Sequence, residues 1–231
     1  MIVTGGRWQN EAVTSFLDSL WAFGAIMGVD KSPEGKGFRL ALHERNPDAP
    51  LSPFYFNLRR VQSHPATLYM AAQMMREKII EDIDGGAFQL IAGIPTAGTP
   101  FSTALSLLMH RGQVSPRMQA KGHGVGDLVD GDFHDGQTVL LVDDLITEAD
   151  SKLRAIDILQ RAGLIVQNIA VLIDREQGGR QRLEAAGYKV HPVFTVTEVF
   201  SYYLAAGEST PAAHDQVMQY IDDQAENHAS P

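Results

Sequence analysis

The chain has 231 residues, of which 44% are hydrophobic and 20% are charged. This is ordinary globular composition, and the length suffices for one α/β domain with a small appendage. The 28 acidic residues outnumber the 19 basic ones, and the resulting net charge of −9 argues against binding to nucleic acid or to an anionic membrane surface. The chain has no cysteine, which excludes disulfides, thiolate metal sites and cysteine nucleophiles.

The hydropathy pattern gives no sign of a membrane segment. No apolar run approaches the roughly 18 residues that a membrane span needs, and the N-terminus lacks a basic segment followed by a hydrophobic stretch and a cleavage site. We therefore expect a soluble, cytoplasmic protein without a membrane partner.

The first half of the chain predicts helices from apolar spacing and strands from alternating or β-branched segments. In chain order these are a helix over residues 10–27, a strand over 38–43, a helix over 64–82, a buried strand over 88–94 and a helix over 101–110. The loop at 93–100 carries two glycines, which would let backbone donors approach an anion. A simple strand-to-helix turn explains this loop equally well.

The second half continues the alternation of strands and helices. Residues 115–118 predict an edge strand, and the polar, glycine-rich connection that follows it to Gly136 has the length of an active-site lid. Buried strands are expected at 139–142 and 166–173 and a further strand at 188–194, and helices are expected at 151–162, 179–186, 197–206 and 212–224. This order predicts a parallel sheet with right-handed crossovers.

Two carboxylates, Asp143 and Asp144, follow the apolar strand at 139–142. Ligands bind at the carboxyl edge of a parallel sheet, and the turn beyond it can offer backbone N–H groups and a helix N-terminus to a phosphate. Adjacent side chains on an extended segment point to opposite sides, so the two acids are not simply one metal-chelating pair. From local pattern alone, an ordinary strand and a helix with Asp150 or Ser151 as N-cap explain the segment about as well.

A hydrophobic run, two acids, two apolar residues, Thr147, a short loop and Ser151 together resemble the phosphoribosyl-pyrophosphate signature of the type I phosphoribosyltransferases. In that family the paired acids hold the ribose hydroxyls and the loop cradles the 5′-phosphate. The resemblance therefore implies that Asp143, Asp144, Thr147 and Ser151 bind phosphoribosyl pyrophosphate.

Two further segments resemble the orotate phosphoribosyltransferases within that family. Residues 52–59 match a Ser-Pro-aromatic-aromatic segment of the N-terminal hood, and the resemblance implies that Tyr55 and Phe56 flank a planar pyrimidine. Residues 174–179 read Asp-Arg-Glu-Gln-Gly-Gly, which implies that Arg175 pairs with the carboxylate of orotate, a contact suited to a planar guanidinium. Without the resemblance, the aromatics would be core packing, and the charged segment a helix start.

The glycine-rich connection resembles the catalytic loop of the same family, with Arg117, Lys121, His123 and Gly124 matching. By this resemblance Arg117, Lys121 and His123 contact the pyrophosphate. Lys121 supplies positive charge as the bond to pyrophosphate breaks, and His123 assists. Without the resemblance, scattered cations on a solvated loop are the better interpretation.

Four of the departures from the family pattern support a different interpretation. Glu148 and Asp150 place carboxylates in the phosphate loop, Ala97 stands where many members have a lysine, and Met118 replaces the lysine that usually follows the arginine. These departures leave open an alternative, a catalytically degraded homologue that acts as a nucleotide-binding or regulatory protein. A phosphoribosyltransferase for another base is a third interpretation, but Arg175 favours an acidic pyrimidine.

The fold that we expect is α/β, a type I phosphoribosyltransferase-like parallel sheet flanked by helices with a small N-terminal hood. One domain is expected over residues 1–231, with the hood at about 1–60, the α/β core at about 61–205 and a C-terminal helical extension at about 206–231.

The expected reaction joins orotate to phosphoribosyl pyrophosphate and yields orotidine monophosphate and pyrophosphate. The resemblance implies Mg²⁺ bound mainly through the pyrophosphate, with no metal site made by protein residues. It also implies a homodimer, because lids of this family commonly act across a dimer interface.

Overall fold

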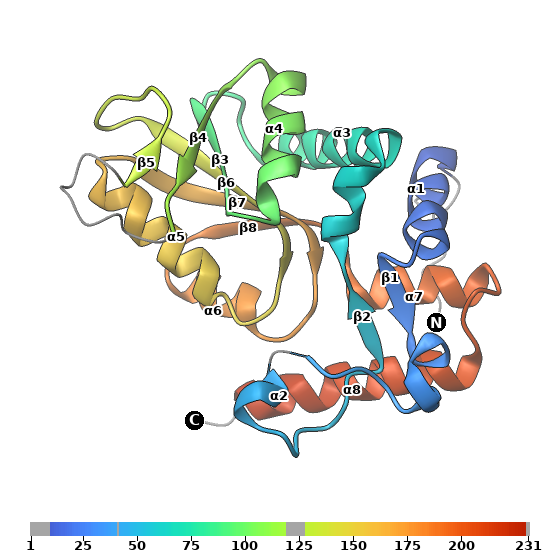
Figure 1. The fold of residues 1–231 in the computed structure, drawn as a ribbon. Helices are drawn as coiled ribbons and strands as arrows, with labels where there is room; N and C mark the ends of the chain where they lie inside the picture. The colour runs from blue at the N-terminus through green and yellow to red at the C-terminus, as the bar shows by residue number, and fades with distance from the viewer. Residues whose placement is uncertain (1–9, 41, 119–127, 230–231) are drawn as a thin grey trace. The chain divides into compact units, whose positions relative to one another are not determined.

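The computed structural model describes residues 10–40, 42–118 and 128–229, and they form two compact units. Unit 1 combines the described parts of Met1–Thr67 and Val196–Pro231, and unit 2 is formed by those of Leu68–Thr195 (Figure 1). The helix expected at 197–206 thus belongs with the N-terminal segments rather than with the α/β core. The single domain over 1–231 stays a prediction.

Unit 2 is built on a six-stranded sheet with the order β5-β4-β3-β6-β7-β8. Its strands are β3 Leu90–Gly93, β4 Gly112–Pro116, β5 Val129–Asp130, β6 Thr138–Ile146, β7 Ile165–Asp174 and β8 Lys189–Thr195. All neighbours are parallel except β4 and β5. The expected α/β fold with a parallel sheet is confirmed. The edge strand expected at 115–118 is wrong, because β5 pairs with β4 and takes the edge position.

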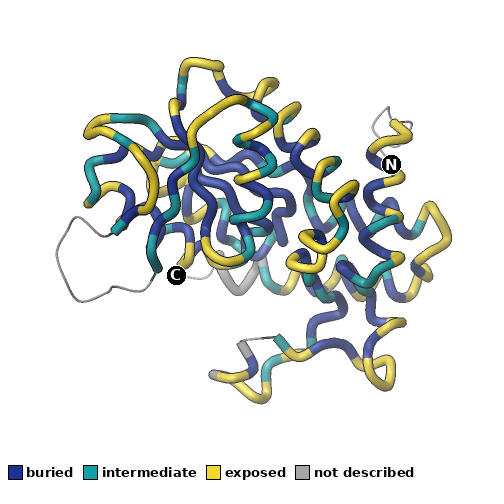
Figure 2. Tube along the Cα trace, turned by 45° about the horizontal axis from the view of Figure 1, so that its top comes forward, coloured by how far each residue is buried: buried dark blue, intermediate teal, exposed yellow. Residues whose placement is uncertain are grey.

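Helices cover both faces of this sheet. They are α3 Pro65–Asp82, α4 Gly98–Met109, α5 Asp150–Arg161 and α6 Gly179–Ala185. Figure 1 shows α3 and α4 on one face and α5 and α6 on the other. Helix α5 buries Ala155, Ile156 and Leu159 in the same apolar cluster as Val139 and Leu141 of β6. The central strands β3, β6 and β7 are buried along most of their length (Figure 2), as expected for a sheet with two covered faces.

Unit 1 pairs the N-terminal segments with the C-terminal helices. Its elements are α1 Glu11–Ala22, β1 Ile26–Gly28, α2 Leu42–Arg45, β2 Phe54–Phe56, α7 Val196–Ala205, α8 Pro211–Ala229 and the 3-10 turns Val29–Lys31, Pro33–Gly35 and Leu58–Ser63. The Tyr203 hydroxyl on α7 donates to the Leu17 carbonyl at 2.8 Å, and its ring lies 4.5 Å from that of Trp21. The two ends of the chain therefore share one core. No helix in the described ranges combines the length and apolar character that a membrane crossing needs.

Two elements of unit 1 differ from the sequence prediction. The helix expected over 10–27 ends at Ala22, because Gly24 adopts a φ of 67° and turns the chain into β1. The strand expected over 38–43 is reduced to one bridge between Phe38 and Ser52. The buried His43 ring bonds to backbone groups of Leu40 and Ala49, which folds this segment back on itself instead of leaving it extended.

Candidate functional site

The order of strands in unit 2 reverses between β3 and β6. The chain leaves β3 for β4 on one side and leaves β6 for β7 on the other, and ligands of open α/β sheets bind outside such a switch point. The loop after β3, in which the Pro95–Thr96 peptide bond is cis, returns against β6. A Cβ on Gly98 would lie 2.6 Å from the Val142 carbonyl oxygen, so only glycine permits this close approach.

Asp143 lies inside β6 and forms a buried ion pair. Because β6 continues to Ile146, both acids are part of the strand near its carboxyl end, rather than following it as the sequence predicted. Asp143 Oδ2 lies 2.6 Å from Lys152 Nζ, and the two side chains are 5% and 4% exposed. The Lys152 ammonium also donates to the Leu145 carbonyl. One lysine of α5 thus holds both a side chain and the backbone at the end of β6.

Asp144 is buried next to Asp143 near the carboxyl end of β6. The backbone N–H of Leu145 donates to its Oδ1 at 2.8 Å. Burial, followed by the charge of Asp143, raises the pKa of Asp144 to about 7. Its carboxyl group therefore changes protonation near neutral pH, whereas a solvated aspartate is ionised there.

The loop from Thr147 to Ala149 joins β6 to α5. Ala149 precedes the helix with a left-handed φ of 73° and without a side-chain cap. The N-cap expected at Asp150 or Ser151 is therefore wrong, because both residues already lie in the first turn of α5. Thr147 is half-buried, while Glu148, Asp150 and Ser151 are exposed. The predicted phosphate loop thus lies at the switch point and leads into a helix N-terminus.

Arg182 of α6 contacts this loop and the first residue of α5. Arg182 Nη1 donates to Asp150 Oδ1 at 2.6 Å and to the Glu148 carbonyl oxygen at 2.8 Å. A Cβ on Gly179 would lie 2.0 Å from the Thr147 carbonyl oxygen. Helix α6 therefore reaches the loop only because its first residue is glycine.

Arg175 follows β7 directly and lies at the same sheet edge. Its backbone N–H donates to the Ile146 carbonyl at 3.1 Å, and the residue is buried. The preceding Asp174 is also buried, and burial raises the pKa of its carboxyl group. The structure therefore brings Arg175 next to the end of β6. This agrees with the sequence prediction, which placed Arg175 directly after a parallel strand.

The predicted catalytic loop is described only at its two ends. Arg117 follows β4, and its Nε donates to both carboxylate oxygens of Asp130 on β5, at 3.0 and 2.9 Å. In this structure the guanidinium therefore has an acidic partner at the sheet edge. Lys121 and His123 lie outside the described residues, so their roles and that of Arg117 stay predictions.

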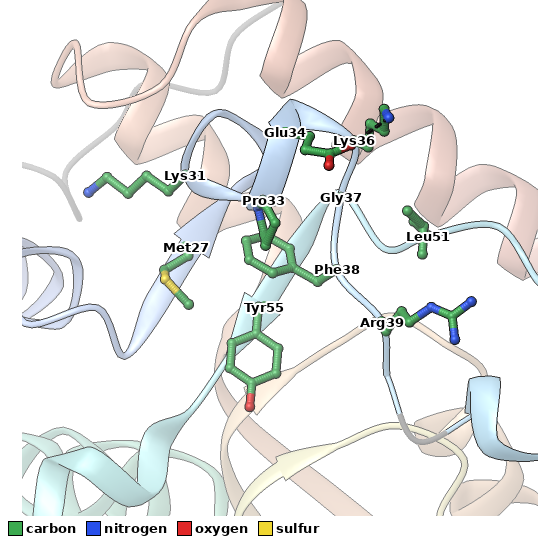
Figure 3. A pocket seen from close by; sticks show the side chains of 10 residues that line it. All are labelled: Met27, Lys31, Pro33, Glu34, Lys36, Gly37, Phe38, Arg39, Leu51 and Tyr55. Carbon is green, nitrogen blue, oxygen red and sulfur yellow. Dashed lines mark hydrogen bonds and ion pairs between the residues drawn. The ribbon is translucent and has the colours of Figure 1, made fainter.

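The two aromatic candidates of unit 1 point to opposite sides of β2. Phe56 is 8% exposed, and its ring packs edge-on against Phe54 and Phe200 in the core. Tyr55 instead lines a cavity of about 730 Å³ and stacks with Phe38 at 5.6 Å (Figure 3). Of the pair that was expected to flank a base, only Tyr55 faces this cavity, and its contact with a ligand stays a prediction.

Sequence reasoning missed Lys152 and Arg182. Lys152 had a local signal, because it occupies the same helical stripe as the buried residues Ala155, Ile156 and Leu159. A charged residue in an apolar stripe indicates a buried partner. Arg182 had no such signal, since its partner Asp150 is 32 positions away in the chain.

Comparison with known proteins places these features in a family. Orotate phosphoribosyltransferase from Pyrococcus furiosus is 35% identical over 159 residues, which cover 69% of this chain and 85% of that protein. The bifunctional enzyme PyrF/PyrE from a Nostoc species is 36% identical over 155 residues, which are 67% of this chain but only 32% of that longer protein. No protein-family model matches the chain.

Solved structures agree with the fold. The structure of Leishmania donovani UMP synthase matches 94% of this chain and 43% of that one, with a TM-score of 0.76 and 24% identity. Orotate phosphoribosyltransferase from Mycobacterium tuberculosis, solved in complex with phosphoribosyl pyrophosphate, covers 63% of this chain and 82% of that one, with a TM-score of 0.53 and 27% identity. The expected type I phosphoribosyltransferase-like fold is confirmed.

Proposed function

This chain belongs to the orotate phosphoribosyltransferase family, and we propose that it transfers the phosphoribosyl group of phosphoribosyl pyrophosphate to orotate in pyrimidine nucleotide synthesis. The bond from the ribose anomeric carbon to pyrophosphate breaks, and a carbon–nitrogen bond to orotate forms. The products are orotidine monophosphate and pyrophosphate. The observation that carries the proposal is the buried pair Asp143 and Asp144 at the switch point, next to a loop that ends at a helix N-terminus.

The ribose and its 5′-phosphate are assigned to the end of β6. Asp143 and Asp144 accept hydrogen bonds from the ribose hydroxyls, and their rigid positions lower the entropy cost of orienting the sugar. Thr147, Ser151 and the backbone N–H groups of the loop hold the 5′-phosphate. The 2.6 Å ion pair with Lys152 holds the Asp143 carboxylate in place.

The base and the leaving group are assigned to the neighbouring strands. Arg175, at the end of β7, pairs with the carboxylate of orotate through its planar guanidinium. Lys121, helped by His123 and Arg117, stabilises the charge that collects on pyrophosphate as it departs. Arg117 must exchange its contact with Asp130 for the substrate to do so.

Magnesium is assigned to the substrate rather than to a protein site. Among the described residues, no group of three or more histidine or acidic side chains is arranged to hold a metal ion. The pyrophosphate oxygens are hard ligands of the kind that Mg²⁺ prefers. When bound, the ion neutralises part of the negative charge of the leaving group. A homodimer and a cytoplasmic location belong to the proposal as expectations from the sequence.

The contact of Asp150 with Arg182 bears on the degraded-homologue alternative. That alternative rests partly on two carboxylates in the phosphate loop, and one of them has a cationic partner at 2.6 Å. The pairing lowers the repulsion that a dianionic phosphate would meet. The loop geometry therefore favours retained substrate binding.

A direct test is to incubate the protein with orotate, phosphoribosyl pyrophosphate and Mg²⁺ and to follow orotidine monophosphate by chromatography. We expect product to accumulate, and we expect none with Arg175→Ala at the same orotate concentration. Calorimetric titration of phosphoribosyl pyrophosphate separates the alternatives. Binding without turnover would support the degraded homologue, and neither binding nor turnover would overturn both.

A further inference from the structure

Arg182 of α6, which contacts the predicted phosphate loop, is not part of the family signature. Arg182 is 53% exposed and Asp150 is 65% exposed, so their ion pair contributes little to folding, at most about 1 kcal/mol. Yet two features bring it to the loop, the glycine at position 179 and two hydrogen bonds from one nitrogen. The contact of Arg182 with the loop thus requires a specific backbone geometry but adds little stability. This combination indicates a role in the candidate site.

The first of these bonds sets the charge of the loop. Asp150 lies in the first turn of α5, where the proposed 5′-phosphate carries about two negative charges. An unpaired carboxylate there would repel the phosphate, and a guanidinium at 2.6 Å offsets that repulsion.

The second bond sets the direction of a peptide group. Arg182 Nη1 holds the Glu148 carbonyl oxygen at 2.8 Å. In a planar trans peptide the C=O and the following N–H point in opposite directions, so the N–H of Ala149 points away from Arg182. The left-handed φ of 73° at Ala149 then turns the next peptide, a geometry that forms anion-binding backbone nests.

We propose that Arg182 is a positioning residue of the 5′-phosphate site: it neutralises Asp150 and orients the Glu148–Ala149 peptide so that the loop accepts a phosphate despite its acidic sequence. This inference rests on the proposed function, because it requires that phosphoribosyl pyrophosphate binds at this loop. It accounts for Asp150, one of the two acidic residues at a site where the family usually has small ones.

Helix α6 supplies a matched control. Arg180 is 40% exposed and pairs with Glu184 at 2.8 Å on its own helix. Arg180→Ala therefore removes one positive charge from the same helix without changing the contacts of the loop. Any loss that is common to both variants reflects the general field of α6, and any loss specific to Arg182→Ala reflects the loop.

The test is a double-mutant cycle read by calorimetric titration with phosphoribosyl pyrophosphate and Mg²⁺. We expect Arg182→Ala to weaken binding about tenfold and Arg180→Ala to change it less than about twofold. Adding Asp150→Ala to Arg182→Ala should recover the part of the loss that comes from the unpaired carboxylate, with Asp150→Ala alone completing the cycle. In steady-state kinetics, KM for phosphoribosyl pyrophosphate should rise for Arg182→Ala while kcat changes little, because the contact acts on ground and transition state alike. Thermal melts of all variants should coincide within a few degrees.

Two results would overturn the inference while leaving the proposed function intact: equal affinities for Arg182→Ala and Arg180→Ala, or a double variant as weak as Arg182→Ala. If the unmodified protein does not bind phosphoribosyl pyrophosphate at all, the proposed function fails first and this inference fails with it. The wild-type titration therefore distinguishes the two failures.

Discussion

Asp144 is buried next to the acidic Asp143, and burial raises its pKa to about 7. An aspartate in the unfolded chain has a pKa near 3.9. Between these values the folded protein keeps a proton that the unfolded chain has lost, so stability falls as pH rises from about 4 to about 7 and stays low above it. Burial of Asp144, a proposed ribose-binding residue, therefore lowers stability to an extent that depends on pH.

Replacing Asp144 by Asn should therefore stabilise the protein at high pH. The amide carries no charge, so we expect a gain on the order of a few kcal/mol above pH 7 and almost none near pH 4. Urea unfolding of both proteins across this range measures the difference. A gain that is constant with pH would mean that Asp144 does not titrate in this window.

Removing one charge of the Asp143–Lys152 pair should destabilise the protein, in contrast to Asp144→Asn, because each residue is the other's buried partner. Lys152→Met leaves Asp143 buried and unpaired, and we expect a loss of about 3–5 kcal/mol of unfolding free energy. Adding Asp143→Asn removes the stranded charge and should recover most of that loss. Urea unfolding at pH 7.5 checks both variants, and a double variant no more stable than Lys152→Met would contradict the pairing.

At the scale of elements, the site depends on how closely the β3–α4 loop approaches β6. A Cβ on Gly98 would meet the Val142 carbonyl at 2.6 Å and Asp143 Oδ1 at 3.0 Å. Gly98→Ala should therefore force α4 from the strand, lower stability by about 1–3 kcal/mol and weaken phosphoribosyl-pyrophosphate binding. Both effects are accessible to chemical denaturation and calorimetry.

Gly112 provides the comparison for this substitution. A Cβ at Gly112 would meet only the tip of the Leu90 side chain, at 2.9 Å, and a side-chain tip moves more easily than a backbone carbonyl. We expect Gly112→Ala to cost less than Gly98→Ala and to leave binding unchanged. Equal losses at the two positions would show that the close approach at Gly98 is not the cause.

At the scale of the whole molecule, an acidic chain is proposed to bind an anionic substrate. The net charge is −9, so attraction must come from local cations and from a metal ion that arrives with the pyrophosphate. Since the described residues offer no metal-binding cluster, the ligand-free protein should have the same melting temperature with and without EDTA. Turnover should stop in EDTA and return with excess Mg²⁺.

A melting temperature that falls in EDTA without substrate would contradict the proposed assignment of the metal. It would place a tight metal site on the protein itself, because only a resident ion stabilises the ligand-free fold. Calorimetric titration of the ligand-free chain with Mg²⁺ is the matching measurement, and we expect no heat of binding at micromolar concentrations.

Local patterns along the chain were sufficient to predict the parallel α/β fold and the position of the candidate site. Apolar runs and helical stripes are local patterns, so they located β6, β7 and α5 to within a few residues. The order of residues from Thr138 to Ser151 carried the family resemblance. Asp143, Asp144 and Arg175 lie at the carboxyl ends of β6 and β7, as the sequence predicted.

Which charged side chains form ion pairs could be learned only from the packing of the elements. Lys152 reaches Asp143 because α5 packs on the face of β6 to which Asp143 points, and Arg182 reaches Asp150 across 32 positions because Gly179 admits α6 to the loop. The packing also decided that Phe56 lies in the core while Tyr55 lines a cavity, and that β5, rather than β4, is the outermost strand of the sheet. Such contacts depend on which elements are neighbours in space, and periodicity along the chain contains no information about distances between elements.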